Sequence, residues 1–545
     1  MQREVIKANF IVFIASFCTL VIELVAGRIM APYVGVSLYT WTSIIGVVLA
    51  GISIGAYLGG RIADRYPRSS TLGWLLFLSG LGAFSISPLT NLIGGAQFQT
   101  SLMTRILLIT TIIFFVPSCL LGMISPVVVK LTLNNLEKTG NVVGKIYAFS
   151  TLGSILGTFA TGFYLISWMG TRYILLTMGI ILVVSSLIFG SFFRSKKAFS
   201  LFFLVLFLSA LLPLVGLHGY AAINPEGFSL PISPIESLKT LYGYAFQPPL
   251  EEESYFFKES DYYTIKLKKS IKGNKGNPLE SLILDHLVHS YTDLTDPLYL
   301  EYEYIRMYEE MVRWQTDKRK SFKALFLGGG GYTFPRFIEA KYSQVEIHVV
   351  EIDPEITRVV KKYLGVPENT KVHTFNEDGR WFVMNCKEKG SYDFIFGDAF
   401  NDLSIPYHLT TKEFAIQLRS LLKPDGLLMA NVIDSFKKGA FMPSYIRTLE
   451  EVFGKGNVHL LTLTSDYDKI GISTCVVVAS QQKLDMDEFV RAVKGKGGEM
   501  TSHVIPQDRL QEYLKERYSV ILTDDYVPVD NLIAPIFEER FGYRQ

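Results

Sequence analysis

The sequence predicts a multi-domain protein in which an α-helical transmembrane bundle is followed by a small β-hairpin domain and an α/β domain. Three observations support this prediction. The chain has 545 residues, which is too long for one hydrophobic core of ordinary size. Long apolar runs lie before about residue 217, whereas clusters of mixed charge lie after about residue 248. In the charged half, a strand pattern, a run of glycines, a helix pattern and a second strand pattern follow one another.

The overall composition gives no support to several classes of function. The 53 basic and 51 acidic residues give a formal net charge of +2, so the charge balance does not indicate a nucleic-acid partner. The four cysteines are far apart and form no CxxC or CxxH motif, so we predict neither a metal site nor a disulfide framework. They are Cys18, Cys119, Cys386 and Cys475.

The N-terminal half predicts a multi-pass protein of the inner or plasma membrane, with the lipid bilayer as a partner. A spanning helix needs roughly 20 mostly apolar residues. Seven segments meet this requirement, at about 9–30, 40–60, 71–93, 105–127, 145–168, 173–193 and 199–218. We therefore assign residues 1–218 to the bundle and the Pro-rich residues 219–253 to a linker.

Basic residues predict the orientation of the bundle. They cluster before the first span and after the second, fourth and sixth spans, while the other connections carry at most one. The positive-inside rule then places the N-terminus in the cytoplasm. Seven spans would leave the C-terminal half outside the cytoplasm, and a count too high by one would leave it inside. The sequence is therefore consistent with the C-terminal half on either side of the membrane.

The soluble half begins with a small β domain, residues 254–296. Two strand-like runs, YYTIKLKK and SLILDHLVHS, flank the turn-forming IKGNKGNP, which predicts a hairpin. Residues 297–545 form the α/β domain, and its first segment, 297–317, has aromatic and apolar residues at helical spacing.

A glycine-rich turn and a following acid predict a Rossmann-like nucleoside site. The apolar run KALFL ends in Gly328, Gly329, Gly330 and a fourth glycine, and a helix pattern follows. The next apolar run, EIHVVEID, closes with acids about 20 residues past the glycines. Small residues let the backbone approach a ligand at a helix N-terminus, and an acid at the tip of the next strand accepts ribose hydroxyls. We expect Glu351 to be that acid.

The remaining strand patterns predict a mixed sheet. They lie at 371–375, 392–397, 426–432, 458–463 and 473–479, and a short polar connection makes the last two an antiparallel pair. A parallel sheet with an antiparallel edge strand is typical of class I S-adenosylmethionine (SAM) methyltransferases and their relatives. Because ligands bind outside the carboxyl ends of parallel strands, we expect Glu351, Asp378 and Asp398 to share one crevice.

Several motifs together resemble the bacterial transmembrane spermidine synthase-like proteins, in which a membrane bundle is fused to an aminopropyltransferase domain. The motifs are GGGGYTFPR, VVEIDPEI, EDGR, DAFNDLSIPYHLTTKEF, LTDDYVPVDNL and, in the membrane half, ELVAGRIMAPYVG. The resemblance implies a transferase of polyamine biosynthesis. Such an enzyme moves an aminopropyl group from decarboxylated S-adenosylmethionine to an amine such as putrescine, without a metal.

The resemblance also implies roles for individual residues. It assigns Glu351 to the ribose, Asp378 with Gly379 to the adenine, and Asp398 to the reacting amine beside the cofactor. An amine attacks only when neutral, so a carboxylate such as Asp398 must orient it and take its proton. Three further residues would contact or orient the amine, with Tyr263 the candidate for catalysis: Tyr262, Tyr263 and Asp402.

The sequence departs from the family pattern where the propylamine chain should bind. Soluble spermidine synthases carry an aspartate inside the glycine turn, and here that position is Gly331. The glutamine expected after LDG falls at His289, a candidate substrate-binding residue, and the glycine itself is His286. The second acid of the loop after Asp398 is Asn401, next to Asp402. Each change weakens recognition of a cationic chain.

Three functions remain open from the sequence. The first is the aminopropyltransferase, the second is a SAM-dependent methyltransferase acting on a membrane or surface substrate, and the third is a non-catalytic membrane protein that binds a nucleoside or polyamine. The glycine at 331 favours the second, while Glu351 and Asp398 argue against the third. The sequence identifies neither the acceptor amine nor the role of the bundle. Soluble relatives form dimers, and a homodimer is the assembly that this resemblance suggests.

Overall fold

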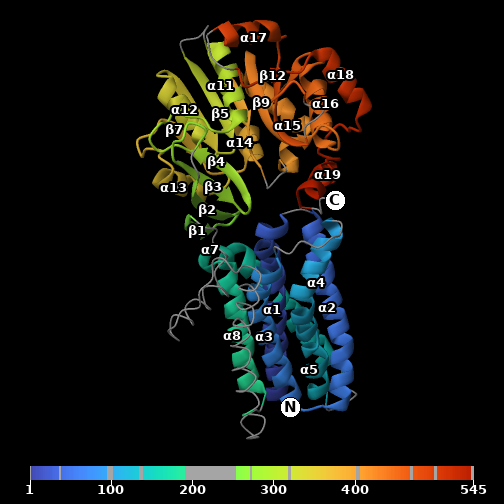
Figure 1. Ribbon diagram of the computed structural model, residues 1–545. Helices are drawn as coiled ribbons and strands as arrows, with labels where there is room; N and C mark the ends of the chain where they lie inside the picture. The colour runs from blue at the N-terminus through green and yellow to red at the C-terminus, as the bar shows by residue number, and fades with distance from the viewer. Residues whose placement is uncertain are drawn as a thin grey trace. The chain divides into compact units, whose positions relative to one another are not determined.

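The computed structural model describes residues 2–35, 38–94, 102–133, 139–190, 200, 253–270, 273–316, 321–400, 405–466, 471–495 and 500–541. The chain divides into two compact units, Met1–Glu252 and Glu253–Gln545. The first unit contains the helices coloured blue to teal in Figure 1, and the second contains the elements coloured green to red.

The described part of the first unit is helical. Its elements are α1 (Gln2–Val34), α2 (Leu38–Arg65), α3 (Ser69–Ile93), α4 (Leu102–Gly122), α5 (Ile124–Thr132), α6 (Thr139–Ala160), the π-helical turn Thr161–Leu165, α7 (Ile166–Met169) and α8 (Thr171–Phe189). Six stretches among the described residues are long and apolar enough to cross a membrane: Val5–Val34, Leu38–Arg65, Ser69–Ile93, Met103–Thr132, Thr139–Leu165 and Thr171–Phe189. Each overlaps one of the first six predicted spans. The seventh, 199–218, and the linker, 219–253, lie outside the described residues except for residues 200 and 253.

Glycines let the helices of this unit approach closely. α1 packs on α6, α2 on α4 and α3 on α8. A Cβ atom at Gly55 of α2 would lie 2.1 Å from the carbonyl oxygen of Cys119, and one at Gly153 of α6 would lie 2.3 Å from that of Phe13. Small residues at helix contacts are common in membrane bundles, because packing and not the hydrophobic effect holds the helices together there.

The second unit starts with a four-stranded antiparallel sheet. Its strands, β1 (Ser254–Glu259), β2 (Thr264–Ser270), β3 (Leu279–Leu284) and β4 (Leu287–Thr292), pair in sequence order. The two runs predicted to form a hairpin are β2 and the β3–β4 pair. The second run folds back on itself at Asp285, whose φ of 54° is left-handed. β1 adds a fourth strand that the hairpin prediction did not include.

The main sheet has eight strands in the order β12-β10-β11-β9-β8-β5-β6-β7. The strands are β5 (Phe322–Leu327), β6 (Val345–Val350), β7 (Val372–Phe375), β8 (Tyr392–Gly397), β9 (Leu422–Ser435), β10 (Val458–Thr462), β11 (Ile472–Ser480) and β12 (His503–Val504). β5 to β9 are parallel, whereas β11 is antiparallel to both β9 and β10. The predicted mixed sheet, with its antiparallel last pair, is confirmed.

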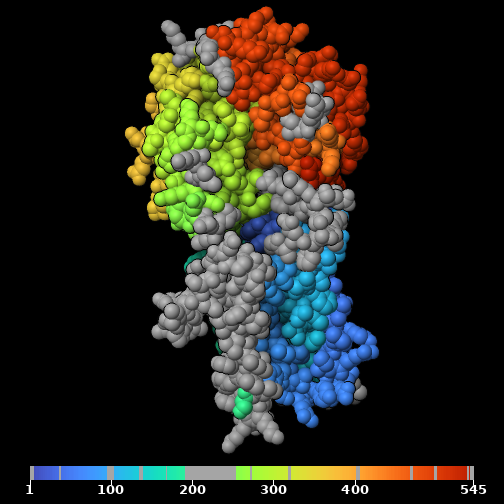
Figure 2. Space-filling model, viewed as in Figure 1, coloured from blue at the N-terminus to red at the C-terminus, as the bar shows by residue number. Residues whose placement is uncertain are grey.

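Helices connect and cover these strands. They are α11 (Glu303–Thr316), α12 (Thr333–Lys341), α13 (Pro354–Tyr363), α14 (Gly379–Asn385), α15 (Lys412–Leu421), α16 (Phe441–Phe453), α17 (Met486–Gly495), α18 (Gln507–Glu516) and α19 (Val529–Phe541), with a 3-10 turn at Tyr407–Leu409. In Figure 2 the small sheet is green, and the antiparallel edge with its helices is orange to red.

The core lies between the main sheet and its helices. The central strands are mostly apolar because both faces of the sheet are covered; Phe394 and Phe396 of β8 are at most 1% exposed. Phe326 of β5 stacks on Phe396 with ring centroids 4.5 Å apart. This packing fixes the carboxyl ends of β5 and β8 next to each other, where the acids predicted for the site follow.

Candidate active site

The glycine-rich turn lies at the carboxyl end of β5. The amide of Gly328 donates to Val350 O of β6, and the amide of Asp398 donates to Leu327 O, both at 2.9 Å. Gly328 has φ +97°, a left-handed conformation that glycine adopts readily. A Cβ atom there would lie 2.4 Å from the carbonyl oxygen of Asp398. Only glycine therefore lets β5 turn this close to the end of β8.

Glu351 follows β6 and points into this turn. Its carboxylate accepts from the amides of Gly329 at 2.8 Å and Asp353 at 3.0 Å, and the residue is 5% exposed. Burial raises the pKa of Glu351, while the two N–H donors oppose that rise. Each carboxylate oxygen has a second lone pair, so the group can still accept hydroxyl donors from a ligand.

Asp378 caps the N-terminus of α14. It accepts from the amides of Arg380 at 2.9 Å and Trp381 at 3.0 Å, and its second oxygen lies 2.9 Å from Nε2 of His408. Burial works to raise the pKa of Asp378, but these hydrogen bonds hold it below the ordinary value. A Cβ atom at Gly379 would lie 3.7 Å from Leu327 Cδ2, so the start of α14 adjoins the end of β5.

Asp398 follows β8, and both of its oxygens have partners. The hydroxyl of Tyr304 in α11 donates to Oδ2, and the amide nitrogen of Asn431 in β9 donates to Oδ1, each at 2.9 Å. Burial raises the pKa of Asp398 to about 6, and the two hydrogen bonds oppose the rise. A carboxylate of this pKa is ionised at neutral pH and is a stronger base than an exposed one.

The two predicted tyrosines lie in the turn between β1 and β2. The hydroxyl of Tyr263 donates to the carbonyl oxygen of Phe400 at 3.2 Å, and burial raises its pKa. Its amide donates to Ser260 Oγ, and Ser260 in turn donates to Asp353. Tyr262 is 43% exposed. The hydrogen bond from Tyr263 to Phe400 thus links the small sheet to the segment after Asp398.

A small cavity of about 30 Å³ lies between the glycine turn and α11. Its lining includes the glycines 328–331, His289, Ser290, Tyr304, Tyr308 and Asp398. Nε2 of His289 is buried and has no hydrogen-bond partner among the described residues. Burial, reinforced by His286, lowers the pKa of His289 to about 4, so the ring is neutral. The cavity is smaller than a whole nucleoside, and neither Glu351 nor Asp378 is among its lining residues, so it is at most one part of a nucleoside site.

The position of the expected turn aspartate is blocked by a neighbour. A Cβ atom at Gly331 would lie 1.9 Å from Ser290 Oγ and 2.6 Å from Ser290 Cβ. Any side chain at 331 therefore requires Ser290 to move. Asn401 and Asp402 lie outside the described residues.

The fold brings most of the predicted residues together. Asp398, His289 and the glycines line one cavity, and Glu351 binds the same turn through Gly329. Sequence reasoning missed Tyr304 and Asn431, the two partners of Asp398. Both residues have a sequence feature that could have identified them. Asn431 is the polar residue within the apolar run LLMANVI, and Tyr304 lies one helical turn before Tyr308.

The profile of the family described as spermine/spermidine synthase domain matches residues 306–485. The match includes the glycine turn, Glu351, Asp378 and Asp398. Residues 306–485 form a spermine/spermidine synthase domain. A relative of nearly full length, the polyamine aminopropyltransferase 2 of Aquifex aeolicus, is 25% identical over 492 residues, 88% of each chain. The family resemblance inferred from the motifs is confirmed.

Two further similarities concern the synthase domain and its surroundings. The probable polyamine aminopropyl transferase of Bifidobacterium longum is 30% identical over 241 residues, which are 41% of this chain and 52% of the relative. The chain thus spans about half the length of that relative. The crystal structure of a probable spermidine synthase from Corynebacterium glutamicum has 21% identity and a TM-score of 0.43, covering 50% of this chain and 96% of that one.

Proposed function

We propose that this chain is a transmembrane polyamine aminopropyltransferase. It would take decarboxylated S-adenosylmethionine as co-substrate and an amine such as putrescine as acceptor. The observation that carries the proposal is the environment of Asp398: a carboxylate of raised pKa, fixed by Tyr304 and Asn431, beside the glycine turn of a synthase domain.

The proposed reaction is a displacement at the carbon next to the sulfonium. The neutral amine nitrogen forms a new C–N bond, the C–S bond breaks, and its electron pair returns to sulfur. The product nucleoside is the neutral thioether methylthioadenosine. The new ammonium then loses a proton, and the ionised Asp398 accepts it. Since no side chain forms a covalent bond to either substrate, the protein contributes position, charge and the proton acceptor.

The roles that we propose for the other residues are those that the family resemblance implies. Glu351 would accept the ribose hydroxyls, and Asp378 with Gly379 would hold the adenine. The backbone at Gly328, Gly329 and Gly330 would leave room for the ligand. On the amine side we keep Tyr263 and Tyr262 as orienting residues, with His289 and Asp402 as contacts to the substrate.

We further propose that the protein is a multi-pass protein of the cell membrane with a cytoplasmic N-terminus, and that it forms a homodimer. Six apolar helices support the first part of this proposal. The side on which the synthase domain lies depends on residues 199–218. A compartment-dependent reporter fused to the C-terminus would identify the side: an even number of spans predicts cytoplasm, and an odd number predicts the opposite side.

A second candidate is a methyltransferase that uses intact SAM. The observation in its favour is the glycine at 331, where a carboxylate for the propylamine nitrogen is missing and Ser290 fills the space. A methyl group needs no such partner, whereas an aminopropyl group carries a cation.

One incubation separates the candidates. Purified full-length protein in detergent would be mixed with putrescine and either decarboxylated or intact SAM, with the Asp398→Asn variant as the matched control. Methylthioadenosine formed only by the unchanged protein supports the aminopropyltransferase, and S-adenosylhomocysteine supports the methyltransferase. If neither nucleoside appears, putrescine is not an acceptor for either reaction, and the proposal of a putrescine aminopropyltransferase is wrong.

A further inference from the structure

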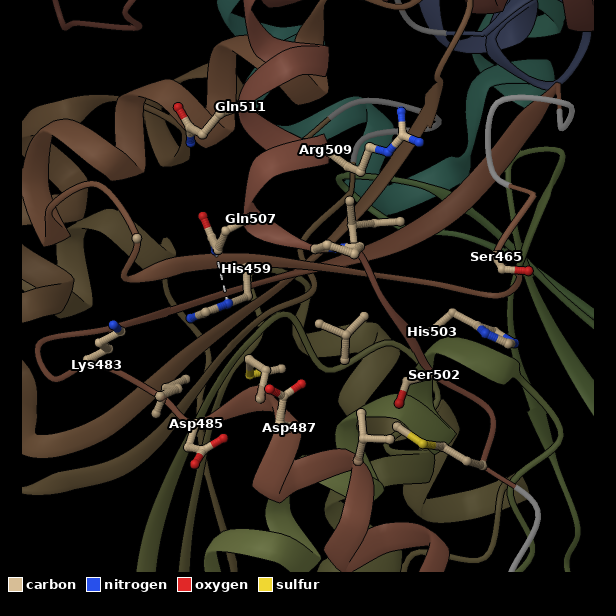
Figure 3. A pocket seen from close by; sticks show the side chains of 18 of the residues that line it. His459, Ser465, Lys483, Asp485, Asp487, Ser502, His503, Gln507, Arg509 and Gln511 are labelled. Atoms are coloured by element: carbon tan, nitrogen blue, oxygen red, sulfur yellow. Dashed lines mark hydrogen bonds between the residues drawn. The ribbon is translucent and has the colours of Figure 1, made fainter.

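The motif LTDDY, residues 522–526, lies against α15, although it belongs to the last part of the chain. α18, shortly before it, borders a depression at the antiparallel edge of the main sheet (Figure 3). Two hydrogen bonds then join the motif to the start of α15. The amide of Lys412 donates to Leu522 O at 2.8 Å, and the amide of Asp524 donates to the carboxylate of Glu413 at 2.9 Å. The motif is therefore fixed beside the segment that leads into α15.

Asp524 of this motif forms an ion pair with Arg380 of α14, 144 residues earlier in the sequence. Nη1 of Arg380 donates to Oδ1 of Asp524 at 2.7 Å, and Nη2 donates to Oδ2, so the contact is bidentate. The two side chains are 21% and 43% exposed. Ion pairs at this exposure usually add little stability, but a bidentate contact holds both groups in one geometry. The hydrogen bonds from Arg380 lower the pKa of Asp524, so the pair is ionised at neutral pH.

Arg380 is also the centre of the contacts around Asp378. Its amide donates to Oδ1 of Asp378 at 2.9 Å. Its Nη1 donates to the carbonyl oxygen of His408 at 2.9 Å and to the hydroxyl of Thr411 at 3.3 Å. The ring of His408 in turn places Nε2 at 2.9 Å from Oδ2 of Asp378. Both oxygens of Asp378 therefore contact groups that Arg380 holds in place, the start of α14 and the 3-10 turn.

Asp378 itself is accessible to a ligand. Its side chain is 35% exposed. Oδ1 accepts from the amides of Arg380 and Trp381, whereas Oδ2 has one partner among the described residues, Nε2 of His408. A carboxylate oxygen has two lone pairs, so Oδ2 can accept one further hydrogen bond. The direction of that lone pair depends on His408 and on the start of α14, and Arg380 fixes both.

We propose that the ion pair of Arg380 and Asp524 positions Asp378 for the amino group of adenine. The C-terminal motif would then take part in nucleoside recognition without touching the ligand. This inference rests on the proposed function, in which Asp378 holds the adenine. Asp524 acts through Arg380, and Arg380 acts through His408 and the start of α14, so both are positioning residues. Without Asp524 the guanidinium loses its bidentate acceptor and is free to turn away from the carbonyl oxygen of His408.

Calorimetry on the full chain in detergent tests this role with two probes. They are methylthioadenosine and its 6-deamino analogue, in which hydrogen replaces the amino group of adenine. We expect the unchanged protein to bind methylthioadenosine about tenfold more tightly, because the analogue offers no donor to Asp378. In Asp524→Ala this preference should fall to about threefold or less, through weaker binding of methylthioadenosine alone.

Two further variants make the test specific. Arg380→Lys keeps the positive charge but lacks the planar fork of arginine, so it should lose the preference as Asp524→Ala does. Asp525→Ala is the matched control, because Asp525 is the next residue and is exposed. It has no hydrogen bond or ion pair in the part of the chain that the structure describes. This variant should keep the preference of the unchanged protein.

The outcomes separate this inference from the proposed function. If the unchanged protein binds both probes equally, Asp378 does not hold the amino group, and its proposed role fails together with the inference. If the unchanged protein has the preference and Asp524→Ala retains it, the inference alone is overturned. An equal loss of affinity for both probes in Asp524→Ala also overturns it, since that result indicates a merely structural contact. Thermal unfolding checks that each variant is folded, and Arg380→Lys decides the matter if Asp524→Ala is not.

Discussion

The hydroxyl of Tyr304 donates to Oδ2 of Asp398 across 2.9 Å, although 94 residues separate the two in sequence. The contact joins α11 to the end of β8. It stabilises the ionised carboxylate and so opposes the effect of burial on the pKa of Asp398, which is about 6. Tyr304, like Asn431, therefore lowers the basicity that burial gives to the proposed catalytic group.

The pH profile should report this contact. Asp398 must be ionised to take a proton, so we expect kcat/KM to fall about tenfold per pH unit below pH about 6. Tyr304→Phe removes a hydrogen bond to the ionised form, which raises the pKa further and moves this acid limb to higher pH. Tyr302→Phe is the control, since the hydroxyl of Tyr302 donates to Val288 O instead. An acid limb that stays in place in Tyr304→Phe would show that another group titrates.

Loss of the carboxylate should separate catalysis from binding. We expect Asp398→Asn to lower kcat by about 100-fold or more, because general-base catalysis contributes on that scale. The affinity for methylthioadenosine should change little, since Glu351 and Asp378 are untouched. Steady-state rates and calorimetry on the same preparation measure both quantities. Activity within a few-fold of the unchanged enzyme means that Asp398 is not the base.

Nucleoside affinity should depend on the acid after β6. Glu351→Ala removes a charged acceptor, and we expect methylthioadenosine to bind about 10- to 100-fold more weakly. Glu346→Ala, at the opposite end of the same strand, is the control and should leave the affinity unchanged. An unchanged dissociation constant in Glu351→Ala, measured by calorimetry, would remove this residue from the proposed ribose contacts.

The glycine turn should not accept the aspartate of soluble spermidine synthases by itself. In Gly331→Asp the new Cβ meets Ser290 Oγ at 1.9 Å, so we expect the free energy of unfolding to fall by about 1–3 kcal/mol. Gly331 is not in the left-handed region, so the backbone conformation there does not oppose a side chain. The double variant Gly331→Asp/Ser290→Gly should recover most of the loss in thermal unfolding. Equal stability of the single variant and the unchanged protein would contradict the proposed clash.

Much of this protein could be inferred from short stretches of chain. Apolar length gives the helices of the first unit, and the alternation of strands, glycines and helices gives the order of the α/β domain. The sequence also places Glu351 and Asp398 directly after strands β6 and β8, and Asp378 three residues after β7. Because parallel strands end at one edge of a sheet, such positions predict a common site without any knowledge of the partners.

The contacts that set the chemistry depend on the tertiary structure. Asp398 meets Tyr304 and Asn431 because the sheet order puts β8 between β5 and β9 and α11 against the same core. Ser290 reaches Gly331 only because the small sheet docks at the glycine turn. Periodicity and turn chemistry are local properties of the chain, whereas pairing and burial are decided by segments that are distant in sequence, and only the folded packing brings those together.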